Sequence, residues 1–313
     1  MDVVTVRALA KRYAGRRVID DFEMHVPQGA IYGFVGKNGA GKSTVMKMIA
    51  GLVTPTGGEI ALFGGQTQGI QRIGMLIENP GLMSNLNAFD TMMTQAIAFG
   101  VPDPKPVCHN LLAQVGLGDV GRKPVKGFSL GMKQRLGIAL ALLGNPDLLL
   151  LDEPLNGLDP EAARSMRNYL VNLNQTRGIT IVISSHVLDQ LERMCTHYGV
   201  IANGRMMREM TADDVTRECG QSLRVRTADP TRTMALLEDC LGSDRNLPSI
   251  GERIGAQTRL VAEPDGSIII SGAFDADQVL SILHANGQEV REMSVQSKDM
   301  EEYFVSLMES RGR

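Results

Sequence analysis

A glycine-rich segment between an apolar run and a helical pattern limits the folds open to this chain. Residues 36–43 read Gly-Lys-Asn-Gly-Ala-Gly-Lys-Ser and fit the pattern GxxxxGK[ST]. Ala30–Val35 before it is typical of a buried strand, and Thr44–Gly51 after it has helical spacing that stops at a glycine. In this order, the glycines let backbone N–H groups surround a phosphate at a helix N-terminus. The sequence therefore predicts a phosphate loop, with Lys42 on the β- and γ-phosphates and Ser43 on Mg²⁺.

A second feature is a pair of adjacent carboxylates after another apolar run. Leu148–Leu151 predicts a buried strand of the parallel type, and Asp152 and Glu153 follow it directly. Because side chains alternate along a strand, the two carboxylates point in different directions. One can then serve a metal and the other a water, which is the division that phosphoanhydride hydrolysis requires. An apolar strand that ends in Asp-Glu is common and does not indicate a function by itself. Together with the phosphate loop, the pair indicates a site for phosphoanhydride hydrolysis.

Composition excludes several classes of protein. The 313 residues contain 32 basic and 35 acidic side chains, a net charge of −3, and 43% are hydrophobic. The chain is therefore long enough for a large core, and its charge gives no reason to expect a nucleic-acid partner. No apolar run reaches the ~18 residues of a membrane helix, so we expect a soluble chain that is not exported. Its four scattered cysteines suit packing roles in a reducing cytoplasm.

The order of predicted elements divides the chain. We expect one domain over residues 1–210, with a helical subdomain at about 85–145, and an accessory α+β domain over 211–313, where acidic residues outnumber basic ones. Within the first domain, the patterns predict strands at Val18–Val26, Ile73–Ile77 and Ile179–Ser184, helices at Asn87–Phe99, Val107–Val115, Leu130–Leu143 and Glu161–Asn174, and a hairpin turn at Asn203-Gly204.

The C-terminal part predicts the order βαββαβ, a split-βαβ module. Gly242–Ala256 has no clear assignment, and a last helix is expected at Lys298–Met308. The predicted elements are strands at Ser222–Thr227, Arg259–Ala262, Ser267–Ser271 and Gln288–Met293, and helices at Thr231–Cys240 and Asp275–Ala285.

Further motifs, in the right order, resemble the ATP-binding subunits of ABC transporters over residues 1 to about 210. Phe128–Arg135 is similar to the family's signature sequence, Asn156–Pro160 to its D-loop and Ser184–His186 to its switch-histidine segment. Tyr13 stands where the family stacks an aromatic ring on adenine. The resemblance implies a P-loop nucleoside-triphosphatase fold of the ABC type with a helical insert, and ATP with Mg²⁺ as cofactors.

The resemblance also assigns roles to individual residues. Catalysis would rest on Glu153, which polarises the attacking water, on His186 at the γ-phosphate and on Lys42. The implied metal ligands are Ser43, Glu78 and Asp152. The implied ATP contacts are Tyr13, Gly36, Lys37, Asn38, Gly39, Ala40, Gly41, Lys42, Ser43, Thr44 and Glu78.

In the family, the signature segment binds the ATP of the opposite subunit. The residues that match are Ser129, Leu130, Gly131 and Met132, and Asp159 matches the D-loop. Structural alternatives remain open: Tyr13 as surface packing, His186 as a satisfied structural histidine, and Ser129 as an ordinary N-cap. The capping and functional roles of Ser129 are compatible, because free N–H groups at a helix start bind anions.

Two departures from the family pattern stand out. Glu78 replaces a common glutamine, and Leu130 and Met132 replace a common glycine and glutamine. A carboxylate near Mg²⁺ binds the metal but repels the γ-phosphate, so we expect Glu78→Gln to change the Mg²⁺ dependence of ATP hydrolysis. The alternative for Glu78 is a surface residue before a proline turn. Gly131 is still a glycine, and without a side chain it lets the backbone approach a phosphate closely.

The loop sequences and the appended module look most like the ATPase subunits of bacitracin- and lantibiotic-type peptide exporters. The resemblance implies an ATP-bound homodimer and a separate integral membrane permease, with this chain on the cytoplasmic face of the membrane. Two other functions remain open: a soluble ABC-type ATPase acting on nucleic acid or ribosomes, and a permease-bound ATPase in lipid handling or assembly. The C-terminal module is either a stabilising appendage or a regulatory, ligand-sensing domain.

Overall fold

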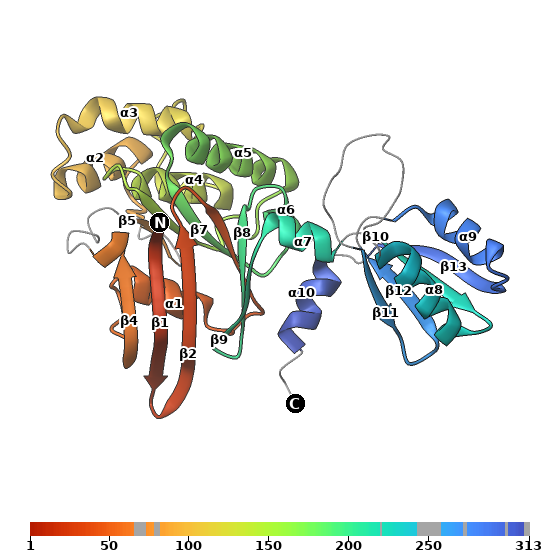
Figure 1. Cartoon of the computed structure of the whole chain (residues 1–313). Helices are drawn as coiled ribbons and strands as arrows, with labels where there is room; N and C mark the ends of the chain where they lie inside the picture. The colour runs from red at the N-terminus through yellow and green to blue at the C-terminus, as the bar shows by residue number, and fades with distance from the viewer. Residues whose placement is uncertain are drawn as a thin grey trace. The chain divides into compact units, whose positions relative to one another are not determined.

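Two compact units make up the chain (Figure 1). The computed structural model describes residues 1–65, 73–77, 82–219, 221–242, 258–271, 274–297 and 300–309. Unit 1 contains Met1–Ala212 with Leu307–Arg313, and unit 2 contains Asp213–Ser306. Helices α7 (Ala212–Glu218) and α10 (Met300–Glu309) contain residues of both units.

Unit 1 is built on a six-stranded sheet with the order β5-β6-β7-β3-β8-β9. All neighbouring strands pair in parallel except β8 and β9, which form the hairpin that the sequence predicts at Asn203-Gly204. Every residue of β3, β6 and β7 is buried, as expected for the centre of a parallel sheet. The strands are β3 (Ile31–Val35), β5 (Ile73–Leu76), β6 (Leu148–Asp152), β7 (Thr180–Ser185), β8 (His197–Ala202) and β9 (Arg205–Thr211).

A separate antiparallel sheet has the order β2-β1-β4. Its strands are β1 (Asp2–Tyr13), β2 (Arg16–Pro27) and β4 (Gly57–Leu62). The sequence predicted only the part of this sheet that lies in β2. The apolar sides of both sheets and of helix α1 (Lys42–Ile49) share one core, which includes Phe22, Phe34 and Met46.

The predicted helical subdomain is present as helices, and no strand occurs between residues 85 and 145, all of which are described. Asn87 caps α2, where its side-chain oxygen accepts a hydrogen bond from the backbone N–H of Asp90 at 2.8 Å. In Figure 1, the helices of this subdomain lie together in the upper part of unit 1. Besides α1, unit 1 contains the helices α2 (Ala88–Ala98), α3 (Pro104–Gln114), α4 (Leu130–Ala141), α5 (Pro160–Arg177) and α6 (Asp189–Glu192), with short 3₁₀ turns at Phe63–Gly65 and Val125–Gly127.

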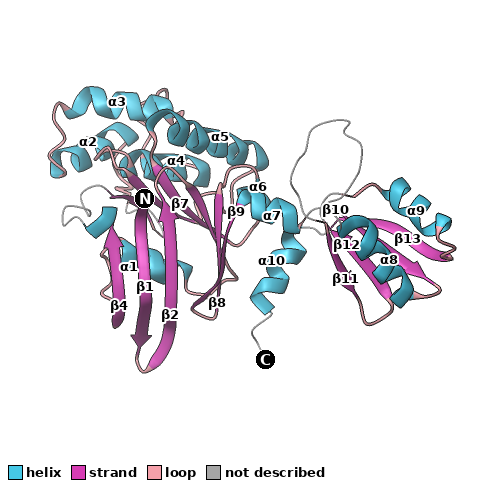
Figure 2. Ribbon diagram, in the orientation of Figure 1, coloured by secondary structure: helices cyan, strands magenta, loops and turns pink. Residues whose placement is uncertain are grey.

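Unit 2 is a four-stranded antiparallel sheet with the order β11-β12-β10-β13 and the chain order βαββαβ (Figure 2). This is the predicted split-βαβ module. Side chains of β10 and β12, among them Leu223 and Ile270, pack with Leu237 of α8 and Leu283 of α9 in its core. The segment without assignment, Gly242–Ala256, lies outside the described residues except for Gly242. The elements are β10 (Gln221–Thr227), α8 (Pro230–Gly242), β11 (Arg259–Ala262), β12 (Ser267–Ser271), α9 (Ala276–Ala285) and β13 (Val290–Ser297).

Two expectations from composition can be compared with the structure. Within the described ranges, no helix has both the length and the apolar character needed to cross a bilayer. The four cysteines are free thiols. Cys108 and Cys195 are buried, and burial raises the pKa of both thiols. The packing interpretation is wrong for Cys240, which is exposed.

Candidate active site

The glycine-rich loop connects the end of β3 to the start of α1, as the sequence predicts. A side chain on Gly36 would have its Cβ 2.6 Å from the carbonyl oxygen of Ile201, so the loop requires glycine there. Gly41, the N-cap of α1, has a φ of 113°, in the region that favours glycine. The first N–H groups of a helix have no partners within the helix, and together with the helix dipole they favour an anion. The geometry of the loop is therefore suited to a phosphate group.

Lys42 crosses this loop from the first turn of α1. Its side chain is only 6% exposed, and Nζ donates a hydrogen bond to the carbonyl oxygen of Gly36 at 2.6 Å. Nζ also lies 3.5 Å from Oε1 of Glu153. The ammonium group thus lies between the phosphate loop and the end of β6.

The two carboxylates after β6 have different partners. Asp152 pairs with Ser184 across β6 and β7, and its Oδ1 accepts a hydrogen bond from the Ser184 hydroxyl at 2.5 Å. The same hydroxyl oxygen accepts a hydrogen bond from the backbone N–H of Glu153 at 3.0 Å. Glu153 has a φ of 50°, a left-handed conformation that is uncommon in non-glycine residues and costs energy. Ser184 therefore holds both residues at the edge of the sheet.

His186 follows β7 and contacts Glu153 from the other side. Its Nδ1 lies 2.8 Å from Oε2 of Glu153, and its side chain is 30% exposed. The histidine is therefore partnered by a carboxylate of this site and is accessible to solvent. Lys42, Glu153 and His186 form one continuous set of contacts, although they come from three separate stretches of sequence.

The oxygen atoms suited to Mg²⁺ are found at the same edge. Ser43 begins α1 beside Lys42, and the Asp152 side chain is nearly buried at the end of β6. Among the described residues, no group of three or more His, Cys, Asp or Glu side chains could hold a metal alone. Mg²⁺ commonly takes one or two protein oxygen ligands and completes its shell with phosphates and water. The residues present fit that donor set, and Glu78, the third predicted ligand, lies outside the described residues.

The signature segment and the D-loop each contain a helix N-cap. Ser129 caps α4, where its Oγ accepts a hydrogen bond from the N–H of Met132 at 3.3 Å, and Asp159 caps α5 in the same way through Ala162 at 2.8 Å. Leu130 is 47% exposed and lies over Gly157 of the D-loop, where an added Cβ would be 2.7 Å from its Cδ2. The two segments are therefore in contact, and the start of α4 is open to solvent.

Tyr13 is the last residue of β1. Its side chain is 45% exposed, so the ring is not packed in the core. Lys11 Nζ lies 4.9 Å from the ring centroid and donates a hydrogen bond to the carbonyl oxygen of Thr54 at 2.6 Å. An exposed aromatic ring is suited to stacking on a purine.

Sequence reasoning missed the part played by Ser184. It placed this serine in the switch-histidine motif but assigned a role only to the histidine. The contact with Asp152 depends on the register of β6 against β7, which no local pattern specifies. One feature of the sequence could have indicated this contact. Two apolar runs that are expected to pair in parallel both end in polar residues.

Comparison with known proteins agrees with this site. The family model described as ABC transporter matches residues 19–156. An uncharacterised ABC transporter ATP-binding protein of Bacillus subtilis, YcbN, is 36% identical over 98% of this chain and 97% of its own length. This chain therefore belongs to the family of ABC transporter ATP-binding proteins and is an ATPase that uses ATP with Mg²⁺.

Other relatives have names that specify a transported compound. The bacitracin transport ATP-binding protein BcrA of Bacillus licheniformis is 35% identical over 98% of this chain and 97% of its own length. The lantibiotic transport ATP-binding protein SrtF of Streptococcus pyogenes is 41% identical over 67% of this chain and 92% of its own length. The predicted resemblance to this group is confirmed.

Solved structures agree on the fold. An ATP-binding subunit of an ABC transporter, 30% identical, covers 69% of this chain and 92% of its own, with a TM-score of 0.62. A dimeric ATP-binding cassette bound to ADP and Pi has a TM-score of 0.61 over 67% of this chain and 98% of its own, and at 21% identity it supports the fold alone. The P-loop fold of the ABC type is confirmed.

Proposed function

We propose that this chain hydrolyses ATP to drive a separate integral membrane permease that exports a peptide antibiotic or a similar amphipathic compound. The contact between Lys42, Glu153 and His186 at the edge of the parallel sheet carries the hydrolytic part of the proposal. The names of the bacitracin and lantibiotic transport relatives support the proposed class of exported compound. A permease-bound ATPase is located at the cytoplasmic face of the membrane.

The contacts suggest how hydrolysis is prepared. Lys42 and the amides of the loop from Gly36 to Thr44 bind the phosphates, and Tyr13 stacks on the adenine. The Lys42 ammonium lies 3.5 Å from the Glu153 carboxylate. In the proposed reaction Lys42 binds phosphate oxygens, and Glu153 orients the attacking water and accepts its proton.

His186 completes the arrangement. Because its Nδ1 contacts Glu153, the other ring nitrogen is left to hold the γ-phosphate. Ser43, Asp152 and Glu78 supply oxygen ligands to Mg²⁺, which neutralises phosphate charge when bound. The negative charge of Glu78 is the reason for the expected change in Mg²⁺ dependence on substitution by glutamine.

The exposed start of α4 is the surface at which a second copy of the chain is proposed to bind. We propose that Ser129, Leu130, Gly131 and Met132 face the γ-phosphate bound to the partner, and that Asp159 lies at the same interface. Two ATP molecules then lie between two chains, and hydrolysis removes this bridge. Because only the closed dimer binds ATP on both sides, the nucleotide shifts the equilibrium toward closure, and this shift drives the permease.

The division into domains is part of the proposal. Residues 1–210 supply the ATPase, with the helical region at about 85–145 as part of the docking surface for the permease. Residues 211–313 form an accessory domain. The separation of units at Ala212 supports this arrangement.

Light scattering tests the dimer. The Glu153→Gln chain with ATP and Mg²⁺ should have the mass of a dimer, and without ATP that of a monomer. Adding Gly131→Asp should restore the monomer with ATP present, because a carboxylate at the start of α4 repels the γ-phosphate of the partner. A matched control, Gly144→Asp, places the charge in an open turn away from the signature and should leave the dimer intact. An ATP-bound Glu153→Gln chain that stays monomeric would contradict the proposal.

A further inference from the structure

The turn between β8 and β9 lies against the phosphate loop. Its two central residues, Asn203 and Gly204, have φ values of 51° and 76°, as a two-residue hairpin turn requires. The backbone N–H of Gly204 donates a hydrogen bond to the carbonyl oxygen of Ala40 in the loop at 3.0 Å. The carbonyl of Ile201, at the end of β8, occupies the space that a side chain on Gly36 would need. Two residues of the loop therefore contact β8 and its turn.

The contact with Ala40 fixes the direction of a neighbouring amide. A trans peptide bond is planar, and its C=O and N–H point in opposite directions. Because the carbonyl of Ala40 points at Gly204, the N–H of Gly41 in the same peptide plane points away from the turn. This N–H has no acceptor among the described residues, and Gly41 is one of the predicted phosphate contacts. The turn is therefore placed to orient this donor.

The turn also packs against β2. A side chain on Gly204 would collide with the carbonyl oxygen of Val18, and its Cβ would lie 3.1 Å from the Cα of Ile19. The carbonyl oxygen of Gly204 accepts a hydrogen bond from the backbone N–H of Asp20 at 3.0 Å. Gly204 therefore uses both of its backbone polar groups to connect β2 with the phosphate loop.

The side chain of Asp20 adds an ion pair to this connection. Its Oδ2 lies 2.5 Å from the guanidinium of Arg205, the residue after Gly204, and its Oδ1 pairs with Arg17. The hydrogen bond from Arg205 is the largest of the effects that lower the pKa of Asp20, so this carboxylate is charged at neutral pH. The first residue of β9 is thus bound to β2 beside the turn.

We propose that Gly204 is a positioning residue for phosphate binding, and that the ion pair of Asp20 with Arg205 keeps the turn on β2. Displacement of the turn releases the carbonyl of Ala40, so the peptide can rotate and the N–H of Gly41 no longer points at the phosphate. Gly204, Asp20 and Arg205 act through the loop and do not touch the nucleotide. This inference rests on the proposed function, because it gives the same phosphate site a support.

Titration calorimetry with ADP and Mg²⁺ on the full chain tests the proposal. ADP lacks the γ-phosphate on which the proposed dimer contact depends, so its binding reports on one loop. In Gly204→Ala the added Cβ moves the turn away from Val18. The Kd for ADP should then rise at least about tenfold, the usual effect of losing a hydrogen bond to a charged group.

The matched control is Gly29→Ala. Gly29 has a φ of 74°, so an alanine there has the same backbone strain as one at Gly204. No atom lies within 4 Å of its added Cβ, and Gly29 precedes β3, at the end of the strand opposite the loop. This variant should bind ADP as the unchanged chain does.

A second pair of variants tests the ion pair without changing the turn. Arg205→Gln removes the charge and should raise the Kd for ADP about threefold, within the range of an exposed ion pair. Arg205→Lys keeps the charge and should bind ADP as the unchanged chain does. A lysine variant that binds as weakly as the glutamine variant would overturn the role of the ion pair.

Two results would overturn the role of Gly204: an unchanged Kd in Gly204→Ala, or an equal loss in Gly29→Ala. Far-ultraviolet circular dichroism verifies that each variant is folded. If Gly204→Ala does not fold, the Arg205 variants decide, and an unchanged Kd in Arg205→Gln would then overturn the inference. An unchanged chain that does not bind ADP would contradict the proposed nucleotide site itself. ADP binding that all variants retain would overturn this inference alone.

Discussion

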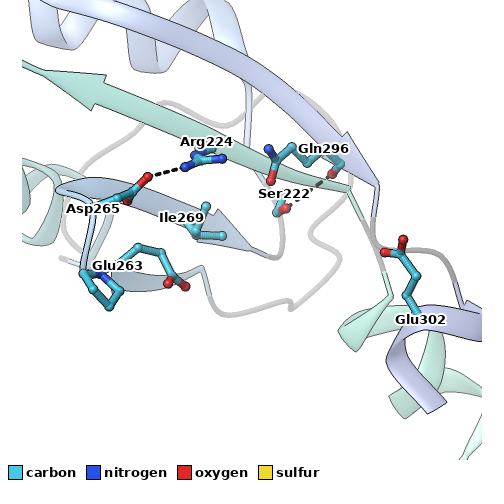
Figure 3. Close-up of a pocket in the computed structure, with 8 residues that line it drawn as sticks. Ser222, Arg224, Glu263, Asp265, Ile269, Gln296 and Glu302 are labelled. Atoms are coloured by element: carbon cyan, nitrogen blue, oxygen red, sulfur yellow. Dashed lines mark hydrogen bonds and ion pairs between the residues drawn. The ribbon is translucent and has the colours of Figure 1, made fainter. Parts of the chain in front are cut away.

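The two units place the residues of the phosphate site and of a pocket on sheets of different construction. In unit 1 the strands run in parallel, so the residues that follow β3, β6 and β7 meet at one edge of the sheet. In unit 2 the strands are antiparallel, and the pocket, about 780 Å³ in volume, combines residues of one face of the sheet with residues of the β11–β12 turn and of α10 (Figure 3). The first arrangement concentrates chemistry in short motifs that follow strands. The second collects single residues from many elements, and no short motif marks them.

The largest effect is expected from Glu153→Gln in unit 1. This substitution removes the proton acceptor for water and keeps the size of the side chain, so turnover of ATP should fall by about 10²–10⁴-fold. Phosphate release measured at saturating ATP is the assay. Glu161→Gln, an exposed residue in the first turn of α5, is the matched control and should keep full activity. Equal loss in both variants would remove the special role of Glu153.

The next effect concerns the independence of the two units. Leu283 is completely buried in the core of unit 2, so Leu283→Ala should lower the free energy of unfolding of that unit by about 2–5 kcal/mol. If the units unfold separately, calorimetry will show a lowered transition for unit 2 while ATPase activity is kept. The counterpart is Leu170→Ala in the core of unit 1, which should lower the transition that ATP stabilises. A single transition shifted by both variants would mean that the units form one cooperative body.

A smaller effect is expected at Tyr13. Replacement by alanine removes the ring proposed to stack on adenine, and stacking of a base on an aromatic side chain contributes about 1–3 kcal/mol. The Kd for ATP should therefore rise by roughly 5- to 150-fold, with little change in kcat. Tyr13→Phe keeps the ring and should bind ATP almost normally. An unchanged Kd in the alanine variant would favour the surface-packing alternative.

The sequence was most informative where structure depends on neighbouring residues. The apolar runs of β3, β6 and β7 and the glycine loop predicted the centre of unit 1, because strands buried on both faces have continuous apolar sequences. Strands β1 and β4 were not predicted. Arg7, Lys11 and Arg12 interrupt the apolar pattern of β1, and its register against β2 is irregular near Ala8, which has a φ of 46°. In the folded sheet β1 pairs with both β2 and β4.

The same distinction applies to the sites. The sequence named Lys42, Glu153 and His186, and the structure brings them together. It gave Ser184 no role of its own, because the contact of this serine with Asp152 depends on strand register. It also missed the unit 2 pocket, whose lining extends from Ser222 to Glu302 and requires the complete sheet. Interactions between distant residues therefore account for what could not be predicted.

The most direct test of the central claim is capture of the membrane partner. The tagged Glu153→Gln chain is purified with ATP from detergent-solubilised membranes of its native host, and the proteins that accompany it are identified by mass spectrometry. Because this variant should keep the closed dimer, we predict a stoichiometric protein with several membrane spans. The variant Lys42→Ala, which should lose phosphate binding, serves as the control for ATP-dependent association. Recovery of ribosomal or nucleic-acid-binding proteins in place of a membrane protein would contradict the transporter account.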